Sequence, residues 1–250
     1  MFPEICRIGG VAVYSYGLML ALAVVVCSFF LSRDAKKMLG LEQEEVLDLV
    51  FWTILAGIVG ARVFYIILNL KFFIEDPKEI FMLQHGGLAF QGGLIFGILA
   101  AVWIILRKGW PFWKTADVIA PYLALGHAIG RIGCFLNGCC YGKSVAWGIY
   151  FPVHEAHLHP TQLYASALLL IIYVLLKKFQ KVGLPAGAVF SLYLMLASVK
   201  RIGVEFFRAD HEALFWGLSV FQWVSIGVFI SGAILWFYLK GKHVSDHNDR

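Results

Sequence analysis

The chain has 250 residues, of which 60% are hydrophobic and 15% are charged, and its mean hydropathy is +0.76. A soluble domain usually carries about 25% charged residues and about half apolar ones, so the composition excludes an ordinary soluble domain and favours a membrane protein. The net charge of +5 comes from short Lys and Arg clusters between apolar runs, and this distribution argues against a nucleic-acid partner.

Seven stretches are long and apolar enough to span a bilayer, which takes roughly 20 mostly apolar residues. In chain order they cover residues 12–32, 48–69, 88–107, 116–138, 161–177, 185–207 and 217–239. The first lacks the basic leading region and small-residue cleavage site of a signal peptide, so we expect it to be retained. The sequence therefore predicts an all-α integral membrane protein, with one polytopic domain over 1–250 and a short, frayed cytoplasmic tail at 240–250.

Positive charges alternate between the connecting loops. Twelve lie on one side of the predicted membrane: Arg33, Lys36, Lys37, Arg107, Lys108, Lys114, Lys177, Lys178, Lys181, Lys240, Lys242 and Arg250. Five lie on the other side: Arg7, Lys71, Lys78, Lys143 and Arg208. Cytoplasmic loops carry the excess of Lys and Arg, so we expect a cytoplasmic C-terminus and an outside N-terminus, which agrees with an odd number of spans.

Four further cations fall within predicted spans: Arg62, Arg131, Lys200 and Arg201. A charge at bilayer depth costs at least about 2.5–3.5 kcal/mol, so each needs a partner, a cavity or a headgroup. Arg201 and Glu205 lie four apart on one helix face and can pair, either as a self-neutralising ion pair or within an anion site. Arg131 has no acidic residue three or four positions away. It either extends to the outer surface or binds a phosphate beside glycines that let a ligand approach the backbone.

Glycines are also frequent in HGGLAFQGGLIFG at 85–97. Two glycine pairs there are compatible with close approach of a ligand to backbone N–H groups, and equally with helix packing through small residues. We assign Gly57, Gly60 and Gly97 to helix packing.

Three of the five cysteines lie in HAIGRIGCFLNGCCYG at 127–142. The spacing of Cys134, Cys139 and Cys140 matches no zinc motif, so we assign no metal site, and a metal site stays only a weak alternative. A thiol relay on the outer, oxidising side is a second alternative, and packing of small, soft side chains near glycines is the commonest arrangement.

Six segments, in this order along the chain, resemble signature elements of the prolipoprotein diacylglyceryl transferases. They are YSYGLMLALA at 14–23, GARVFY at 60–65, GGLAFQGGLIFG at 86–97, GRIGCFLNGCCYG at 130–142, HPTQLY at 159–164 and RIGVEFFR at 201–208. Any one is weak evidence, but the ordered set is specific and covers nearly the whole chain. The resemblance implies a multi-pass protein of the bacterial plasma (inner) membrane, with its active site toward the outer leaflet.

The activity implied by the resemblance is transfer of a diacylglyceryl group from phosphatidylglycerol to the lipobox cysteine of a prolipoprotein. The product is a thioether, and glycerol-1-phosphate leaves. The expected partners are therefore phosphatidylglycerol, a lipobox peptide and membrane lipid, with no cofactor and no nucleic acid. The chemistry needs a thiolate as nucleophile and charge stabilisation of the departing phosphate, for which Arg is suited.

Site residues follow from the same resemblance. Arg131 matches the arginine that binds phosphatidylglycerol, Arg201 a second essential arginine, and Glu205 the residue that positions Arg201. The implied catalytic residues are Arg201, Glu205 and His127, and the implied lipid-binding residues are Arg131, Tyr16, Gln91 and Gly142.

The chain departs from better-known members at several of these positions. They carry a His, proposed as the base, where this chain has Gln91, and they carry Asn and Glu where it has Cys134 and Cys139. Because Gln cannot act as a base, another group must take the thiol proton: His85, His127, Glu205, the lipid phosphate or water. We favour His127, which lies one helical turn before Arg131.

Other functions stay open at this point. A family relative that transfers another lipid group would explain the missing His. A membrane thiol–disulfide carrier would use Cys134, Cys139 and Cys140. A non-catalytic lipid-binding or transport protein is disfavoured, because the chain lacks paired, broken helices in matching halves.

Overall fold

The computed structural model describes residues 1–8, 11–82, 86–209 and 213–248. Its helices are α1 (Ser15–Leu39), α2 (Gln43–Leu68), α3 (Leu70–Glu75), the 3-10 helix η1 (Pro77–Phe81), α4 (Phe90–Arg107), α5 (Phe112–Asn137), α6 (Thr161–Phe179), α7 (Ala188–Glu205) and α8 (Val220–Asn248). Its strands form three antiparallel pairs: β1 (Glu4–Ile8) with β2 (Val11–Tyr14), β3 (Ser144–Phe151) with β4 (Ala156–Leu158), and β5 (Ala213–Phe215) with β6 (Leu218–Ser219).

A helix covers each of the seven predicted spans. Six of these helices, among the described residues, are long and apolar enough to cross a membrane: Ser15–Leu39, Gln43–Leu68, Phe90–Arg107, Phe112–Asn137, Thr161–Phe179 and Val220–Gly241. The remaining helix, α7, covers the predicted span 185–207. It has 18 residues but carries Lys200, Arg201 and Glu205 near its C-terminal end, which lowers its hydropathy. The protein is thus a multi-pass membrane protein, and the count of seven spans stays a prediction.

The residues group into two compact units. The first contains Met1–Leu31 and Ala116–Arg250, and the second contains Ser32–Thr115. The sequence alone suggests one continuous domain, because neither boundary coincides with a change in composition. Each unit is described by itself below.

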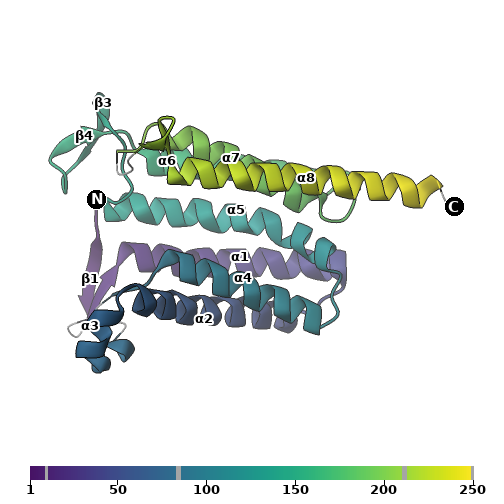
Figure 1. Ribbon diagram of the computed structural model, residues 1–250, viewed down its shortest axis with the longest axis horizontal. Coiled ribbons are helices and arrows are strands. Elements are labelled where there is room, and N and C mark those ends of the chain that lie inside the picture. The colour runs from purple at the N-terminus through teal and green to yellow at the C-terminus, as the bar shows by residue number, and fades with distance from the viewer. Residues whose placement is uncertain (9–10, 83–85, 210–212, 249–250) are drawn as a thin grey trace. The chain divides into compact units, whose positions relative to one another are not determined.

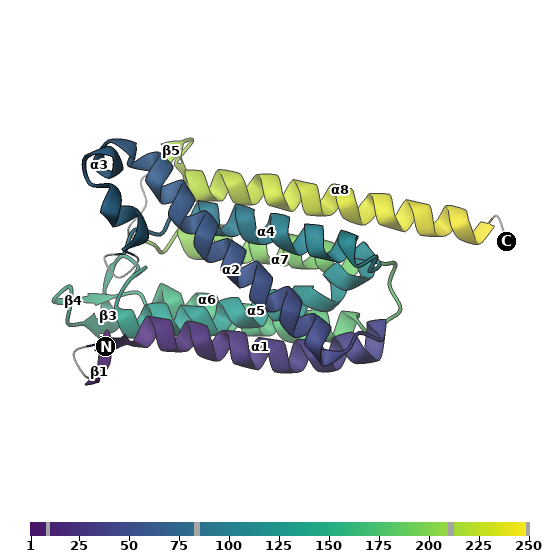
Figure 2. The same cartoon turned by 90° about the horizontal axis from the view of Figure 1, so that it is seen from below.

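In the second unit, α2 lies inclined against α4 and the contact is built from glycines (Figure 2). A Cβ atom at Gly60 would lie 2.8 Å from the Gly92 carbonyl oxygen and would also collide with Phe96. A Cβ atom at Gly92 would collide with Gly60 and Phe64. The backbones therefore approach as closely as small residues allow. The packing interpretation of Gly60 is confirmed, and the glycine pair at Gly92 serves the same contact.

Arg62 of α2 is buried and fastens the segment between α3 and α4. All its hydrogen bonds go to backbone carbonyl oxygens: Nε donates to Ile80, Nη1 to Gly86 and Gly87, and Nη2 to Glu79 and Met82. An arginine has five N–H donors, so this set uses them fully. The predicted intramembrane charge of Arg62 is therefore accounted for by the fold.

In the first unit, α5, α6, α7 and α8 lie side by side (Figure 1). Fully buried alanines on α5, Ala120, Ala124 and Ala128, let Leu169 and Leu176 of α6 pack closely against it. Such spacing by three or four residues keeps the small side chains on one helix face.

The start of α7 is held from α5 by one carboxylate. Asp117 accepts hydrogen bonds from the backbone N–H groups of Gly187 at 2.6 Å and Phe190 at 2.8 Å. These N–H groups have no partner within the helix, so the carboxylate caps α7 from a neighbouring helix.

The three strand pairs are an addition to the predicted all-helical fold. In both views they lie at one end of the first unit, together with the C-terminal end of α5 and the N-terminal end of α6 (Figure 1). At the other end, α8 runs on to Asn248, where the sequence predicts a frayed tail from residue 240. The helix continues because residues 240–248 contain neither Gly pairs nor Pro that would end it.

Candidate functional site

One face of α5 carries His127, Arg131 and Cys134, which follow one another at helical spacing. The Nε–H group of Arg131 donates to Nε2 of His127 at 3.2 Å. Within the described part of the chain, the two terminal nitrogens of Arg131 have no hydrogen-bonding partner. The side chain is therefore oriented by His127 while its guanidinium fork stays available to an anion.

The glycines beside Arg131 face α1. A Cβ atom at Gly133 would lie 3.0 Å from Met19 and 3.3 Å from Tyr16, and one at Gly130 would contact Leu20 at 3.7 Å. At Gly133 the expectation that a ligand approaches the backbone is therefore wrong, because α1 already occupies that space, whereas Gly130 makes only an ordinary contact. Tyr16 itself, in the first turn of α1, lies within electrostatic range of Arg131.

A second group of charges lies at the C-terminal end of α7. Glu205 is buried and its carboxylate pairs with Arg201 at 3.0 Å, so the predicted ion pair is confirmed. The same carboxylate lies 4.0 Å from Nε of Arg208 and accepts a hydrogen bond from the Ser219 hydroxyl at 2.8 Å. The Arg201 guanidinium also stacks over the Phe221 ring at 4.9 Å. Glu205 therefore holds two arginines in fixed positions.

The two groups of charges act on one another. The charges of Arg131, Arg201 and Arg208 all reach Lys200, which is buried in α7. No carboxylate pairs with Lys200 among the residues that the structure describes. We call Arg131, Lys200, Arg201 and Arg208 the cation cluster. It gathers four basic side chains around the buried Glu205 carboxylate, an arrangement that suits an anionic ligand.

The turn after α5 is held by the start of α6. The Gln162 side chain donates to the Cys139 carbonyl oxygen at 2.6 Å, and the Thr161 hydroxyl donates to that of Cys140 at 2.7 Å. Both donors are fully buried. Gly138 and Cys140 adopt positive φ angles of 77° and 61°, the left-handed conformation that a non-glycine residue rarely adopts. The HPTQLY segment thus fixes a strained turn.

Gly142 ends this turn in a crowded position. A Cβ atom there would lie 2.6 Å from the Phe207 carbonyl oxygen and 2.6 Å from His159. Gly142 forms a β-bridge with Arg208, and the neighbouring Lys143 N–H donates to Phe207 at 2.8 Å. The absence of a side chain at Gly142 therefore lets the Arg208 segment lie against the turn.

The same turn gathers the three thiols. The sulfur atoms of Cys134, Cys139 and Cys140 lie within 4.8 Å of one another, and all three residues are free cysteines. Hydrogen bonds from the other two thiols lower the pKa of Cys140, and the positive charges of Arg208 and Arg131 lower it further, against the opposing effect of burial. The thiols are therefore neighbours of the cation cluster.

Two sequence-predicted positions do not belong to the described residues of the first unit. Gln91 is exposed in the first turn of α4 and belongs to the second unit. His85 lies outside the described residues. Conversely, sequence reasoning assigned Arg208 only to the loop charges and gave Lys200 no role. The signal for Arg208 was its spacing of three residues from Glu205, and that for Lys200 was a cation at bilayer depth without an acidic neighbour in sequence.

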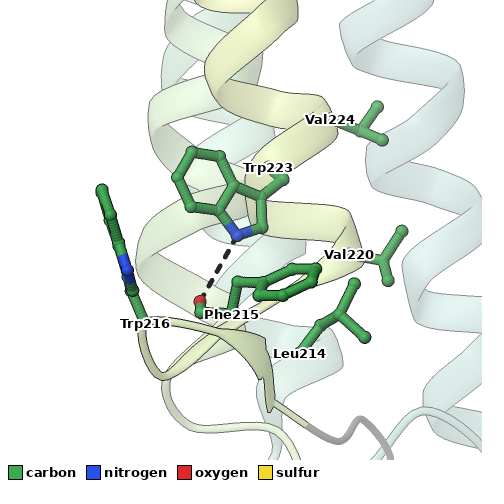
Figure 3. Close-up of a pocket in the computed structure, with 6 residues that line it drawn as sticks. All are labelled: Leu214, Phe215, Trp216, Val220, Trp223 and Val224. Atoms are coloured by element: carbon green, nitrogen blue, oxygen red, sulfur yellow. Dashed lines mark hydrogen bonds between the residues drawn. The ribbon is translucent and has the colours of Figure 1, made fainter.

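An open apolar pocket of about 400 Å³ lies at the start of α8 (Figure 3). It is lined by Leu214, Phe215, Trp216, Val220, Trp223 and Val224, and the Trp223 indole N–H donates to the Phe215 carbonyl oxygen at 3.4 Å. Phe221, which stacks on Arg201, is not part of this lining. The pocket offers no charged group, so it suits hydrocarbon and the aromatic belt of a membrane interface.

Comparison with known proteins identifies the relatives of this chain. The sequence model of the family described as "Prolipoprotein diacylglyceryl transferase" matches residues 3–238. The chain belongs to this family. It is 33% identical over 239 residues to the phosphatidylglycerol–prolipoprotein diacylglyceryl transferase of Clostridium tetani, covering 93% of this chain and 95% of the relative. It is also 33% identical over 246 residues to the Shouchella clausii protein of the same name, covering 94% and 88%.

A third relative is a Clostridium perfringens protein named phosphatidylglycerol–prolipoprotein diacylglyceryl transferase 2, which is 32% identical over 246 residues and covers 94% of this chain and 95% of the relative. The predicted family is therefore confirmed. In this member of the transferase family, three signature segments meet in one unit. GRIGCFLNGCCYG provides Arg131 and the thiols, HPTQLY holds the turn, and RIGVEFFR provides Arg201, Glu205 and Arg208.

Proposed function

We propose that this protein transfers the diacylglyceryl group of phosphatidylglycerol to the lipobox cysteine thiol of prolipoproteins, forming a thioether and releasing glycerol-1-phosphate. Membership of the transferase family and the names of the three relatives support this activity. The single structural observation that carries the proposal is the cation cluster gathered around the Glu205 carboxylate. A phosphodiester headgroup is the anion that a membrane supplies at such a site.

Arg131 is the proposed primary ligand of the lipid phosphate. Its planar fork matches two phosphate oxygens, and its terminal nitrogens have no partner within the described residues. Lys200 adds a point charge from α7. An anion bound between the two would relieve the repulsion of cations that the fold brings together.

Arg201 and Arg208 act at the reacting centre. When the bond between the glyceryl carbon and the phosphate oxygen breaks, the phosphate gains a second negative charge. Preorganised cations stabilise charge that develops in the transition state, and they do so best when they need not reorient. Glu205 supplies this fixed geometry through its pairs with both arginines.

The hydrogen bond of His127 to Arg131 argues against His127 as the base that accepts the thiol proton. In the neutral imidazole only one ring nitrogen has a free lone pair, and here Nε2 accepts the Arg131 N–H. We therefore assign His127 to positioning Arg131, and the proton of the substrate thiol needs a different acceptor. Tyr16 is a proposed hydrogen-bonding partner of the lipid, and Gly142 shapes the site by lacking a side chain. A lipid-binding role of Gln91 stays a prediction from the family resemblance.

The setting of the reaction follows from the charge distribution. With the N-terminus outside, the cation cluster lies toward the outer leaflet of a bacterial plasma membrane, at headgroup depth. Its partners are then phosphatidylglycerol and a lipobox peptide presented from the membrane. We expect no nucleic-acid partner.

An in-vitro assay tests the proposal. Purified protein is mixed with phosphatidylglycerol and a lipobox peptide, and addition of diacylglyceryl is read as a mass shift. We expect transfer by the wild type and a loss of roughly 100-fold or more in R131A, because a transition-state cation is removed. The matched control is K71A, which removes an exposed cation of α3. Equal activity of R131A and K71A would disprove the role of Arg131, and transfer only from another phospholipid would replace the proposed substrate.

A further inference from the structure

The three thiols form the densest group of potential metal ligands in the described chain. Their sulfur atoms lie within 4.8 Å of one another, although Cys134 lies in the last turn of α5 and Cys139 and Cys140 follow that helix. The spacing Cys-x4-Cys-Cys in the sequence does not indicate that the three thiols lie close together. A helix followed by a left-handed turn at Gly138 brings the second and third thiols back to the first.

The turn that presents the thiols is rigid before any ligand binds. Gln162 and Thr161 hold the carbonyl groups of Cys139 and Cys140 from α6. The left-handed backbone of Cys140 is strained for a residue that carries a side chain, and such conformations persist only where the surroundings impose them. The buried Oε1 atom of Gln162, on the same side chain, has no hydrogen-bonding partner within the described residues.

We infer that Cys134, Cys139 and Cys140 together bind one thiophilic metal ion, Zn²⁺ being the natural candidate, and that the incoming substrate thiol is its fourth ligand. Thiolates select zinc and other soft ions. Three protein ligands leave one position of a tetrahedral ion open, as in catalytic zinc sites, whereas structural sites are closed by four. Arg131 lies on the same face of α5 as Cys134, and Arg208 is bridged to Gly142, two residues after Cys140, so basic side chains neighbour the thiolates and offset their negative charge.

This inference rests on the proposed function and explains how the substrate thiol can lose its proton without a protein base. Gln91 has no titratable group, and His127 already accepts a hydrogen bond from Arg131. A thiol that coordinates zinc is deprotonated outright, so no protein base is required.

The resulting step is balanced. The substrate thiol binds the metal and releases its proton to water. The bound thiolate forms the S–C bond with the glyceryl carbon, the C–O bond to phosphate breaks, and its electron pair leaves on glycerol-1-phosphate. No group is oxidised or reduced.

Cobalt titration tests the site directly. The reduced full-length protein in detergent is titrated with Co²⁺, and sulfur-to-cobalt charge-transfer absorption is recorded. We expect one Co²⁺ per chain, displaced by Zn²⁺, with the absorption lost or strongly reduced in C134S, C139S and C140S. The matched control is C6S, which alters an exposed cysteine of β1 and should bind as the wild type does. Absence of stoichiometric charge-transfer absorption in the reduced wild type would overturn the inference.

Two further measurements do not depend on the variants' folding. Zn²⁺ should raise the melting temperature of the wild type, since a ligand bound only by the folded state stabilises it. A lipobox peptide should add charge-transfer intensity to the cobalt protein, whereas its Cys-to-Ser analogue should not. An unchanged melting temperature would contradict metal binding, and an unchanged spectrum with the cysteine peptide would contradict the open fourth position.

A transfer assay then distinguishes failure of the metal inference from failure of the proposed transferase function. Metal-free protein should transfer roughly 100-fold more slowly than zinc-loaded protein, the scale of a missing general base. Equal rates would overturn the metal inference and leave the transferase intact. No transfer by zinc-loaded protein would overturn the proposed function, while the cobalt titration would still decide whether the metal site exists.

Discussion

Two intramembrane arginines that look alike in sequence have opposite roles in the structure. Arg62 donates all its N–H groups to backbone carbonyls, so an anion could bind it only by displacing them. Arg131 is oriented through Nε alone and keeps its terminal nitrogens available. Hydropathy indicates that either charge is unfavourable within a bilayer. Only the hydrogen-bonding partners show that Arg62 has a structural role.

The first prediction at the residue scale concerns Arg62. R62K keeps the charge but offers three donors instead of five, in a different geometry, so at least two carbonyl groups lose a partner. Each buried carbonyl left without a hydrogen bond costs about 1–3 kcal/mol, and we expect a clear fall in melting temperature in detergent. The R131A melting temperature should stay near that of the wild type. A stable R62K protein with selectively lost transfer would instead indicate that Arg62 binds substrate.

The second prediction concerns Glu205. E205Q retains an oxygen for the Ser219 hydroxyl but removes the carboxylate charge that pairs with Arg201 and Arg208. Breaking a buried pair costs about 3–5 kcal/mol, because the remaining charges are left uncompensated. We expect a lower melting temperature and transfer reduced at least tenfold in the mass-shift assay. S219A, which removes only the hydrogen bond, is the control and should lose less. Equal effects would locate the role of Glu205 in the Ser219 contact rather than in its charge.

At the scale of elements, glycines decide which helices can touch. Gly60 and Gly92 allow α2 and α4 to meet backbone to backbone, whereas Gly133 lets the Met19 and Tyr16 side chains of α1 pack against the backbone of α5. Small residues at an interface are the usual route to close helix packing in a membrane, where burial of apolar side chains gives little driving force. The glycines near functional segments therefore shape the scaffold and leave ligand contacts to charged side chains.

G60A tests this at the α2–α4 contact. Its Cβ atom would collide with Phe96 and lie 2.8 Å from the Gly92 oxygen, so the helices must separate. Overpacking of this kind costs about 1–3 kcal/mol, and we expect a lower melting temperature. G57A, one turn earlier on the same helix, meets only the Gly93 oxygen at 3.4 Å and should change stability little. Equal stability of G60A and the wild type would mean that the contact is looser than the structure has it.

Sequence predicted the helices well because each span needs a long apolar run that local composition reveals. It did not predict the strand pairs, since their pairing partners and short lengths carry no periodic signal. The bridge between Gly142 and Arg208 joins residues far apart in the chain, and so Arg208 looked like an ordinary loop cation. For the same reason the convergence of Cys134 with Cys139 and Cys140 was hidden, because it depends on a turn imposed by Thr161 and Gln162.

For the whole molecule, orientation in the membrane decides whether the cation cluster faces the leaflet from which the substrates come. Twelve loop cations on one side against five on the other predict a cytoplasmic C-terminus. The N-terminal strand pair and the C-terminal end of α8 then lie on opposite sides. This placement puts exposed Cys6 outside, at the same end of the first unit as the other strand pairs.

Orientation is tested on intact cells. A thiol reagent that cannot cross the membrane should modify Cys6, identified by mass spectrometry of the N-terminal peptide, before the cells are opened. A fluorescent protein that matures only in the cytoplasm, fused after Arg250, should fluoresce. Reversing the chain would carry most of its loop cations across the membrane, against the bias that sets topology, so both reporters are expected to agree. If Cys6 reacts only after lysis and the fusion stays dark, the cation cluster faces the cytoplasm, and lipid and prolipoprotein must then reach it from the inner leaflet.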